Sequence, residues 1–292
     1  MRSKVKPLLF ISPALLYLSV WIYYPILNNL YLSFFDAPTP RSRDYFFVGL
    51  QNYIRLFQDE LFLKSLWHNI LWVLLSIAIP VVMGLVLAVL LAGRRRTRLF
   101  YAGVYFIPQT IAAVIAAIVW RWIYDPNIGL LNQALESVGL SGLTQQWLAN
   151  ESLVLVSVNM IGSWTYVGFC VLIFMAGLQN INPTLYDAAM IDGANSLQRF
   201  FYITLPLLRS TILFVIVFTI IGSMKFFDLI FVATRGGPNN ASYVVGLYIY
   251  NLFLHQGRVN YAATTSTVLT AIILLFSVIL IRNIISTNNQ EA

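Results

Sequence analysis

The sequence contains little charge, one cysteine and two histidines. Charged residues make up 10% of the 292 residues and apolar residues 59%, whereas a soluble domain has about 25% charged and about 45–50% apolar residues. A chain with so little polar surface cannot cover a folded exterior in water, so its surplus of apolar side chains must face lipid. The single cysteine, Cys170, excludes a disulfide within the chain.

Several catalytic and ligand-binding signatures are also missing. No GxxxxGK[ST] spacing occurs, so the chain has no P-loop to cradle the phosphates of ATP. An intramembrane serine protease needs a G-x-S-G serine and a histidine base, and neither His68 nor His255 accompanies such a motif. No cluster has metal-ligand spacing. We therefore predict a protein that is not an enzyme, with no catalytic residue, no metal site and no cofactor of its own.

Six apolar runs are long enough for spanning helices, which need about 20 mostly apolar residues. They are residues 7–35, 65–93, 99–120, 152–178, 210–234 and 259–281. Backbone amides in hydrocarbon must bond within their own segment, so we predict that all six runs are α-helices. A seventh stretch, residues 243–254, is too short to span and predicts an interfacial helix.

Lysine and arginine are concentrated in the segments that would lie on one side of the membrane. With the N-terminus inside, the inner segments hold Arg2, Lys4, Lys6, Arg94, Arg95, Arg96, Arg98, Arg199, Arg209 and Arg282. The outer loops hold fewer, spread over longer segments, so both termini are predicted to be cytoplasmic. The net charge of +7 thus reflects membrane topology and not a nucleic-acid partner. The first run is too long for a signal peptide and predicts an uncleaved span.

The sequence of the inner segment between the fourth and fifth runs predicts a helix with small side chains on its surface. Thr184 is expected to cap this helix, with Asp187 at its third position. Ala188 and Ala189 add almost no side-chain bulk, so another protein could approach closely. Gly193 is expected to end the helix.

A second short helix is expected after this bend. Asn195 or Ser196 can cap it. Pro206 suits the first turn of the span that follows. The predicted product is a helix, a bend and a helix on the cytoplasmic face.

This segment resembles the EAA loop of binding-protein-dependent ABC importer permeases. The likeness is carried by Asp187-Ala188-Ala189, Gly193, Ile203, Leu205 and Pro206, with Asp187 where the family usually has Glu. Residues 47–53, 120–126, 129–132 and 236–238 match the family's outer loops in the same order. Together they are similar to the first permease of the carbohydrate branch, as in the maltose and glycerol-phosphate transporters.

The resemblance implies an all-α membrane protein with the type I ABC importer permease fold, six transmembrane helices and both termini cytoplasmic. We expect an N-terminal span and first outer loop in residues 1–64. The transmembrane core would cover residues 65–282, with its coupling loop at 179–208, and residues 283–292 would form a cytoplasmic tail.

The resemblance also implies a function and its partners. The chain would form half of the pathway for a sugar or sugar-like solute in the bacterial inner membrane. A second homologous permease would complete the pathway, and a solute-binding protein would dock on outer loops 36–64 and 235–261. A cytoplasmic ATPase dimer would bind ATP and Mg. The implied ATPase-coupling residues are Asp187, Ala188, Ala189, Gly193, Ala194, Ile203, Leu205 and Pro206.

In sugar-transporting relatives the solute is held by the spans before and after the coupling loop. The corresponding positions here are Ser163, Trp164, Tyr166, Phe169, Gly222, Ser223, Phe226 and Asp228. Aromatic rings with a few hydroxyl or carboxylate groups suit sugars, whose rings have apolar faces and polar rims. The same residues could be ordinary packing or interfacial aromatics. Lys225 and Asp228 would share one helix face and could pair.

Three alternatives stay open at this point. The bent segment could be an ordinary capped loop. The protein could be a secondary transporter that works without an ATPase, although such folds often have internal repeats, and none is visible here. It could also be a purely structural membrane subunit. The solute could be a disaccharide, an oligosaccharide, a glycosylglycerol or a glycerol phosphate.

Overall fold

The computed structural model describes the backbone of residues 2–93 and 96–291, and side chains within residues 10–93, 96–279 and at 282. Of the predicted inner charges, Arg94 and Arg95 lie outside the described residues, as do the side chains of Arg2, Lys4 and Lys6. The chain divides into two compact units, Met1–Leu63 with Tyr248–Ile272, and Lys64–Leu247 with Ile273–Ala292. They are called unit 1 and unit 2 below.

Unit 1 holds the N-terminal helices and a small hairpin. Its elements are α1 (Arg2–Leu18), the π-helix η1 (Ser19–Tyr23), α2 (Tyr24–Leu32), β1 (Phe35–Asp36), β2 (Phe46–Phe47), α3 (Gln51–Gln58), the π-helix η6 (Asn251–His255) and the first half of α16 (Val259–Glu291). The Asn29 amide nitrogen donates to Ser266 Oγ (3.2 Å) and Thr267 Oγ1 (3.1 Å), which ties α2 to α16. Thr264 Oγ1 donates to the Ser33 carbonyl (3.0 Å) at the end of α2.

Unit 2 is a helical bundle built around one long helix, α9 (Val154–Gln179). Its other elements are most of α4 (Glu60–Ser76), the π-helix η2 (Ile77–Val81), α5 (Val82–Ala92), α6 (Arg98–Phe106), the 3₁₀ turns η3 (Ile107–Thr110) and η4 (Ser141–Leu143), α7 (Ala113–Ile123), α8 (Leu130–Ser137), α10 (Pro183–Ile191), α11 (Ser196–Arg199), the π-helix η5 (Phe200–Thr204), α12 (Leu205–Leu207), α13 (Arg209–Met224), α14 (Asp228–Ala233) and α15 (Val245–Tyr250).

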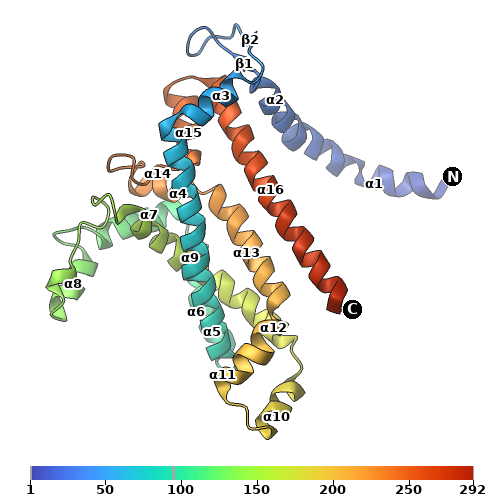
Figure 1. The fold of residues 1–292 in the computed structure, drawn as a ribbon, viewed down its shortest axis with the longest axis vertical. Helices are drawn as coiled ribbons and strands as arrows, with labels where there is room; N and C mark the ends of the chain where they lie inside the picture. The colour runs from blue at the N-terminus through green and yellow to red at the C-terminus, as the bar shows by residue number, and fades with distance from the viewer. Residues whose placement is uncertain (1, 94–95, 292) are drawn as a thin grey trace. The chain divides into compact units, whose positions relative to one another are not determined.

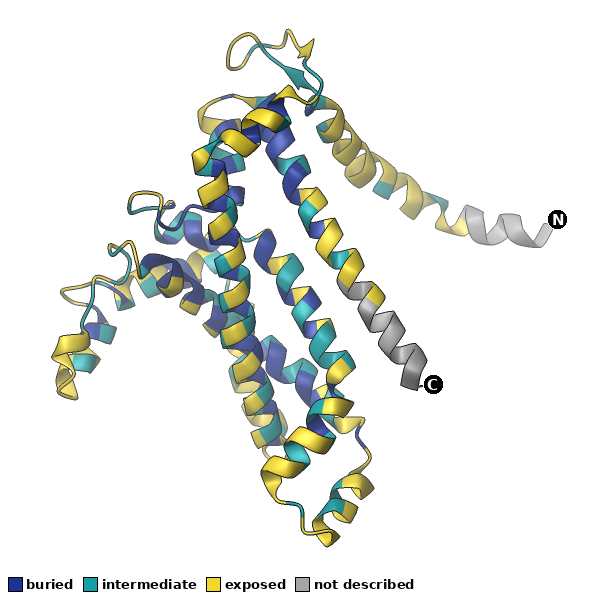
Figure 2. Cartoon of the chain, in the orientation of Figure 1, coloured by how far each residue is buried: buried dark blue, intermediate teal, exposed yellow. Residues whose placement is uncertain are grey.

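The core of unit 2 lies where small residues let α9 approach its neighbours. A Cβ added at Gly84 would collide with Cys170 Cβ, so α5 and α9 meet closely there. A Cβ added at Gly168 would collide with the Tyr105 carbonyl group of α6. Close approach at small residues is typical of helix packing in membranes. Figure 2 shows the buried residues gathered along α9 and α14, whereas α8 and α10 are mostly exposed.

Among the residues that the structure describes, four continuous helices are long and apolar enough to cross a membrane, namely Phe10–Leu32, Glu60–Ala92, Val154–Gln179 and Val259–Ile279. Two further candidates are bent, by 94° between Arg98–Thr110 and Ala113–Ile123 and by 67° between Ser196–Leu207 and Arg209–Met224. The described part of the chain therefore contains four candidate spans, or six if each bent pair is one span. The predicted continuous helix over 99–120 is wrong, because Pro108 lies in the turn η3 and the chain is extended at Ile111.

The predicted continuous helix over 210–234 is also wrong. Helix α13 ends at Met224 and α14 begins at Asp228. Lys225 and Asp228 are both exposed and do not share a helix face, and no ion pair joins them among the described residues. The short helix expected over 243–254 is confirmed, since α15 and η6 cover Val245–His255.

The segment between α7 and α8 is a turn held by the side chains of Asp125 and Asn132. Asp125 Oδ1 accepts the backbone N–H groups of Asn127 (2.9 Å) and Ile128 (3.0 Å), which holds the pKa of this carboxyl below its usual value. Asn132 Oδ1 accepts Trp147 Nε1–H (2.8 Å). Gly129 has no room for a Cβ beside the Asp125 backbone. The turn therefore explains why Asp125 and Gly129 occur in the family-like ranges 120–126 and 129–132.

The contact between Gly168 and α6 generates a stability prediction. Gly168→Ala should push α6 away from α9 and lower the free energy of unfolding by about 1–3 kcal/mol, the usual range for overpacking. The matched control is Gly103→Ala, because a Cβ at Gly103 meets no atom within 4 Å. Thermal unfolding in detergent should show a lower midpoint for Gly168→Ala only. Equal midpoints for the two variants would contradict the close approach.

Candidate functional site

The segment that links α9 to α13, residues 180–208, is called the bent segment below; it begins with α10, whose start differs from the prediction. Asn182 is the N-cap, and its Oδ1 accepts the backbone N–H of Thr184 (3.1 Å). Pro183 occupies the first helical position, where its missing N–H costs nothing. The prediction that Thr184 caps the helix is wrong because the Asn-Pro pair is the stronger start signal. Asp187 therefore lies in the second turn and not at the third position.

The bend after α10 is made by glycine, as predicted. Gly193 has φ +79°, and its N–H donates to the Met190 carbonyl (3.1 Å). The Ala194 N–H donates to the Ala189 carbonyl (2.8 Å). These two bonds form a Schellman motif, which needs a left-handed residue at the position of Gly193.

The second helix starts with a complete capping box. Asn195 Oδ1 accepts the Gln198 N–H (2.9 Å), and Gln198 Oε1 accepts the Asn195 N–H (2.8 Å). The prediction of a cap at Asn195 or Ser196 is confirmed at Asn195. Pro206 lies in α12, before the 67° bend, and α13 begins at Arg209. The prediction that Pro206 occupies the first turn of the fifth span is therefore wrong.

One hydrogen bond across the bend was not predicted. Tyr186 on α10 and Thr204 on η5 are joined through their hydroxyl groups at 2.9 Å, and Thr204 is buried. No local pattern signals this bond, since the two residues are 18 positions apart. It ties the first helix of the bent segment to the chain that leads into α13.

The bent segment presents apolar side chains outward. Ile191 is 87% exposed and Tyr202 80% exposed. Exposed apolar residues of the segment are Leu185, Met190, Ile191, Leu197, Phe201, Tyr202 and Leu207. Among the expected coupling residues, Asp187, Ala188, Gly193 and Pro206 are exposed, and Ala189, Ala194, Ile203 and Leu205 are half-buried. Figure 1 shows α10, α11 and α12 together at one end of unit 2.

A cavity of about 250 Å³ lies between α4, α7, α9 and α13. It brings together five of the eight residues that were expected to line the solute pathway: Ser163, Tyr166, Gly222, Ser223 and Phe226. The sequence reading missed Trp72, Ser76 and Gln109, which line the same cavity. The sequence offers little to identify these three residues, because its composition marks α4 and the segment near Pro108 only as apolar.

The other three expected lining residues lie elsewhere. Trp164 lines a neighbouring apolar cavity of about 330 Å³ and meets Trp120 edge to face, with ring centroids 5.7 Å apart. Phe169 is stacked between Tyr166 (5.4 Å) and Phe218 (5.2 Å). Asp228 is exposed in the first turn of α14.

Four polar residues that line the 250 Å³ cavity, Ser76, Ser163, Tyr166 and Thr219, are held by side-chain hydrogen bonds. Tyr166 and Thr219 share a hydroxyl hydrogen bond of 3.0 Å. The Asn159 amide nitrogen donates to Ser76 Oγ (3.0 Å), and Ser163 Oγ donates to Asn159 Oδ1 (3.1 Å). In an apolar bundle such groups are costly unless they are paired or face a cavity, so this cavity has a fixed polar edge.

Asn69 on α4 stabilises the chain where the helix is interrupted between α13 and α14. Its amide nitrogen donates to the Met224 carbonyl (3.2 Å), and its oxygen accepts the Val245 N–H (2.8 Å). One turn away on the same helix, Trp72 stacks on Phe226 with ring centroids 4.8 Å apart. Asn69 thus satisfies two backbone groups that helix ends leave open, and α4 fixes Phe226 at the cavity.

Replacing Asn69 should disturb both stability and the cavity. Asn69→Leu leaves the Met224 carbonyl and the Val245 N–H buried without a partner, at about 1–3 kcal/mol each. We expect a lower melting midpoint and faster proteolysis within residues 225–227. The control is Asn127→Leu, in an exposed turn. If the Asn69 variant melts like this control, the amide does not hold the break.

A family model described as "Binding-protein-dependent transport system inner membrane component" matches residues 80–289. The probable ABC transporter permease protein YurN of Bacillus subtilis is 35% identical over 94% of both chains. The osmoprotective compounds uptake permease protein GgtC of Synechocystis sp. is 36% identical over 97% of this chain and 99% of its own.

A third relative and one solved structure agree with these matches. The lactose transport system permease protein LacF of Rhizobium radiobacter is 32% identical over 92% of this chain and 90% of its own. A chain in the crystal structure of a bacterial alginate ABC transporter, in complex with an alginate pentasaccharide-bound periplasmic protein, has the same fold. Its TM-score is 0.82 at 21% identity, covering 96% of this chain and 93% of that chain. The chain therefore belongs to the inner-membrane components of binding-protein-dependent transport systems, and it is a multi-pass permease of the ABC transporter family.

Proposed function

We propose that this permease forms one half of the transmembrane pathway of an importer that takes up a sugar or sugar-like solute. A second homologous permease completes the pathway, and a solute-binding protein delivers the solute to the outer loops. A cytoplasmic ATPase dimer binds and hydrolyses ATP with Mg, so this chain itself is not an enzyme. In this proposal the chain crosses the membrane six times, each bent pair counting as one span, and both termini are cytoplasmic.

The proposal for energy coupling rests on the structure of the bent segment. A Schellman bend and a capping box hold α10 and α11 in a fixed arrangement, while Ile191 and Leu197 remain exposed beside the small residues Ala188 and Ala189. A helix pair whose surface carries apolar and small side chains can fit closely into a cleft of another protein. Because the pair is already ordered, little conformational entropy is lost on binding. Movement of the ATPase would then reach α13 through the Tyr186–Thr204 bond and the bend at Leu208.

The composition of the 250 Å³ cavity supports a carbohydrate solute. Trp72, Tyr166 and Phe226 supply aromatic faces, and Ser163 and Ser223 supply hydroxyl groups. Apolar faces with a few placed polar groups are what sugar-sized ligands need. The names of relatives agree, since one is a lactose permease and another a sulfoquinovosyl glycerol permease. Family membership disfavours the alternative of a secondary transporter, which would work without an ATPase.

The coupling proposal is tested by a carboxylate placed at the bend. Gly193→Asp should lower solute-stimulated ATP hydrolysis of the assembled transporter at least about tenfold, because charge and backbone strain enter the docking surface. Gly139→Asp is the matched control: Gly139 has φ +80° against +79° for Gly193, and a Cβ at either meets no atom within 4 Å. Equal hydrolysis by the two variants, both folded and assembled, would refute the coupling role.

The solute proposal is tested at the aromatic cavity. Phe226→Ala removes one stacking face, and Ser223→Ala removes one hydroxyl group. Loss of an aromatic contact is worth about 0.5–1.5 kcal/mol, which is about two- to tenfold in affinity. We expect both variants to change the order in which a panel of sugars competes for uptake. Phe100→Ala, exposed on α6, is the control. Unchanged competition by the two cavity variants would refute this lining.

A further inference from the structure

The 250 Å³ cavity also receives a polar residue from the turn η3, namely Gln109. This turn ends the helical segment Arg98–Thr110, just before the 94° bend that leads into α7. The Ile111 N–H donates to the Pro108 carbonyl (3.2 Å), which closes the turn. Gln109 therefore lines the cavity from a stretch of backbone that has its own hydrogen bond.

The side chain of Gln109 is free to bind a ligand. It is exposed and has no hydrogen-bond partner among the residues that the structure describes. Its neighbour Thr110 differs, because the Thr110 hydroxyl donates to the Ile107 carbonyl (2.7 Å) and Thr110 does not line the cavity. Within a membrane span, a polar group without a protein partner is costly unless it faces a cavity. The position of the Gln109 amide thus fits a group that contacts solute.

Several hydroxyl protons at this cavity are already donated within the protein. The Thr219 hydroxyl donates to the Val215 carbonyl (2.7 Å), so the Tyr166 hydroxyl must be the donor in its bond to Thr219 (3.0 Å). The Ser163 hydroxyl donates to Asn159 Oδ1 (3.1 Å). These oxygens can still accept a hydrogen bond, but their protons are not available to a solute. A free amide adds two N–H donors and one carbonyl acceptor to such a cavity.

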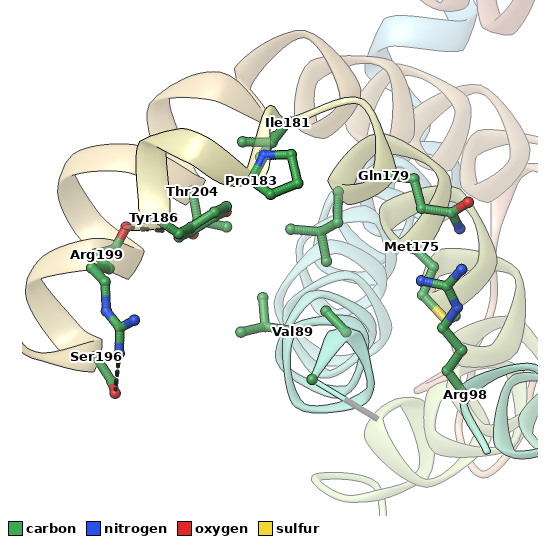
Figure 3. A pocket seen from close by; sticks show the side chains of 13 residues that line it. Val89, Arg98, Met175, Gln179, Ile181, Pro183, Tyr186, Ser196, Arg199 and Thr204 are labelled. Atoms are coloured by element: carbon green, nitrogen blue, oxygen red, sulfur yellow. Dashed lines mark hydrogen bonds between the residues drawn. The ribbon is translucent and has the colours of Figure 1, made fainter. Parts of the chain in front are cut away.

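The cavity also differs from others in this chain in its charge. Among the described residues that line it, none is charged. A second cavity, of about 870 Å³, lies beside the bent segment and is lined by Arg98 and Arg199, which Figure 3 shows on opposite sides of it. A charged solute in an apolar bundle is costly without an opposite charge. The 250 Å³ cavity therefore suits an uncharged solute that carries hydroxyl groups.

We propose that Gln109 is a specificity-determining residue whose amide hydrogen-bonds a hydroxyl group of an uncharged, sugar-like solute. Trp72 and Phe226 pack on the apolar face of this solute, and the amide orients its polar rim. The inference rests on the proposed function, because it needs the cavity to lie on the solute pathway. It retains disaccharides, oligosaccharides and glycosylglycerols as solutes and excludes glycerol phosphate.

The test measures uptake by the assembled transporter, with its binding protein, in proteoliposomes. Lactose, sucrose, glucosylglycerol and glycerol 3-phosphate are each supplied at saturating concentration, so that the maximal rate reports passage through the permease and not affinity for the binding protein. The uncharged solute with the highest rate is then compared with its monodeoxy analogues. The variants are Gln109→Met, which keeps the length of the side chain, and Gln109→Ala. The matched control is Gln146→Met, because Gln146 is exposed and does not line the cavity.

In the wild type and in Gln146→Met, at least one monodeoxy analogue should pass about two- to tenfold more slowly than the parent solute, the usual effect of one hydrogen bond. In the Gln109 variants the parent should slow to the rate of that analogue, so that the difference between the two disappears. A purely structural defect would slow both and keep their ratio. Because the ratio is internal to each sample, it does not depend on how much of a variant assembles.

Three results would overturn the proposal: no analogue slower than its parent in the wild type, an unchanged ratio in the Gln109 variants, or faster uptake of glycerol 3-phosphate than of every uncharged solute. Gln109→Ala keeps the test valid should Gln109→Met fail to assemble. If the wild type takes up none of the four solutes, the proposed function itself is contradicted, and this result is distinct from an unchanged ratio.

Discussion

Backbone hydrogen bonding in an apolar environment is the constraint on which the rest of this structure depends. A helix in hydrocarbon satisfies its own N–H and C=O groups, so every break in a span must find partners for the groups that it frees. Asn69 supplies one at the end of α13, where it donates to the Met224 carbonyl, and one at the start of α15, where it accepts the Val245 N–H. In the bent segment the partners are local, through the caps at Asn182 and Asn195 and the glycine bend.

The breaks are also where the candidate functional residues lie. Phe226 is in the chain between α13 and α14, and its ring lines the cavity while it stacks on Trp72. The 67° bend before α13 gives Ser196–Leu207 a direction different from that of α13. A straight helix could neither expose such a segment for docking nor bring Phe226 onto the face of Trp72. In the proposed function, the coupling segment and Phe226 both lie where regular helix geometry is interrupted, whereas Ser163 and Tyr166 lie within the continuous helix α9.

How far the sequence predicts the structure depends on the range of the interaction. Gly193 and Asn195 were read correctly because a helix end and a capping box are determined by residues a few positions apart. The start of α10 was misread by two residues, because an Asn-Pro pair outweighs a threonine cap. The break after Met224 was missed altogether, since the residue that makes it tolerable, Asn69, lies 155 positions away in the sequence. The suggested pairing of Lys225 and Asp228 is wrong because of this break, which leaves the two residues on no common helix. Trp72 was missed because composition identifies a span without indicating which face meets a cavity.

The central claim is that the bent segment touches the ATPase, and site-directed cross-linking tests it most directly. Cys170 is fully buried, so a thiol introduced by Ala188→Cys should be the reactive one. In the assembled transporter, treated with a short bifunctional thiol reagent against cysteines placed around the ATPase cleft, the account predicts a covalent adduct of permease and ATPase. The comparison variant Ser137→Cys, exposed on α8, should form none. An adduct at position 137 and none at position 188 would contradict the account.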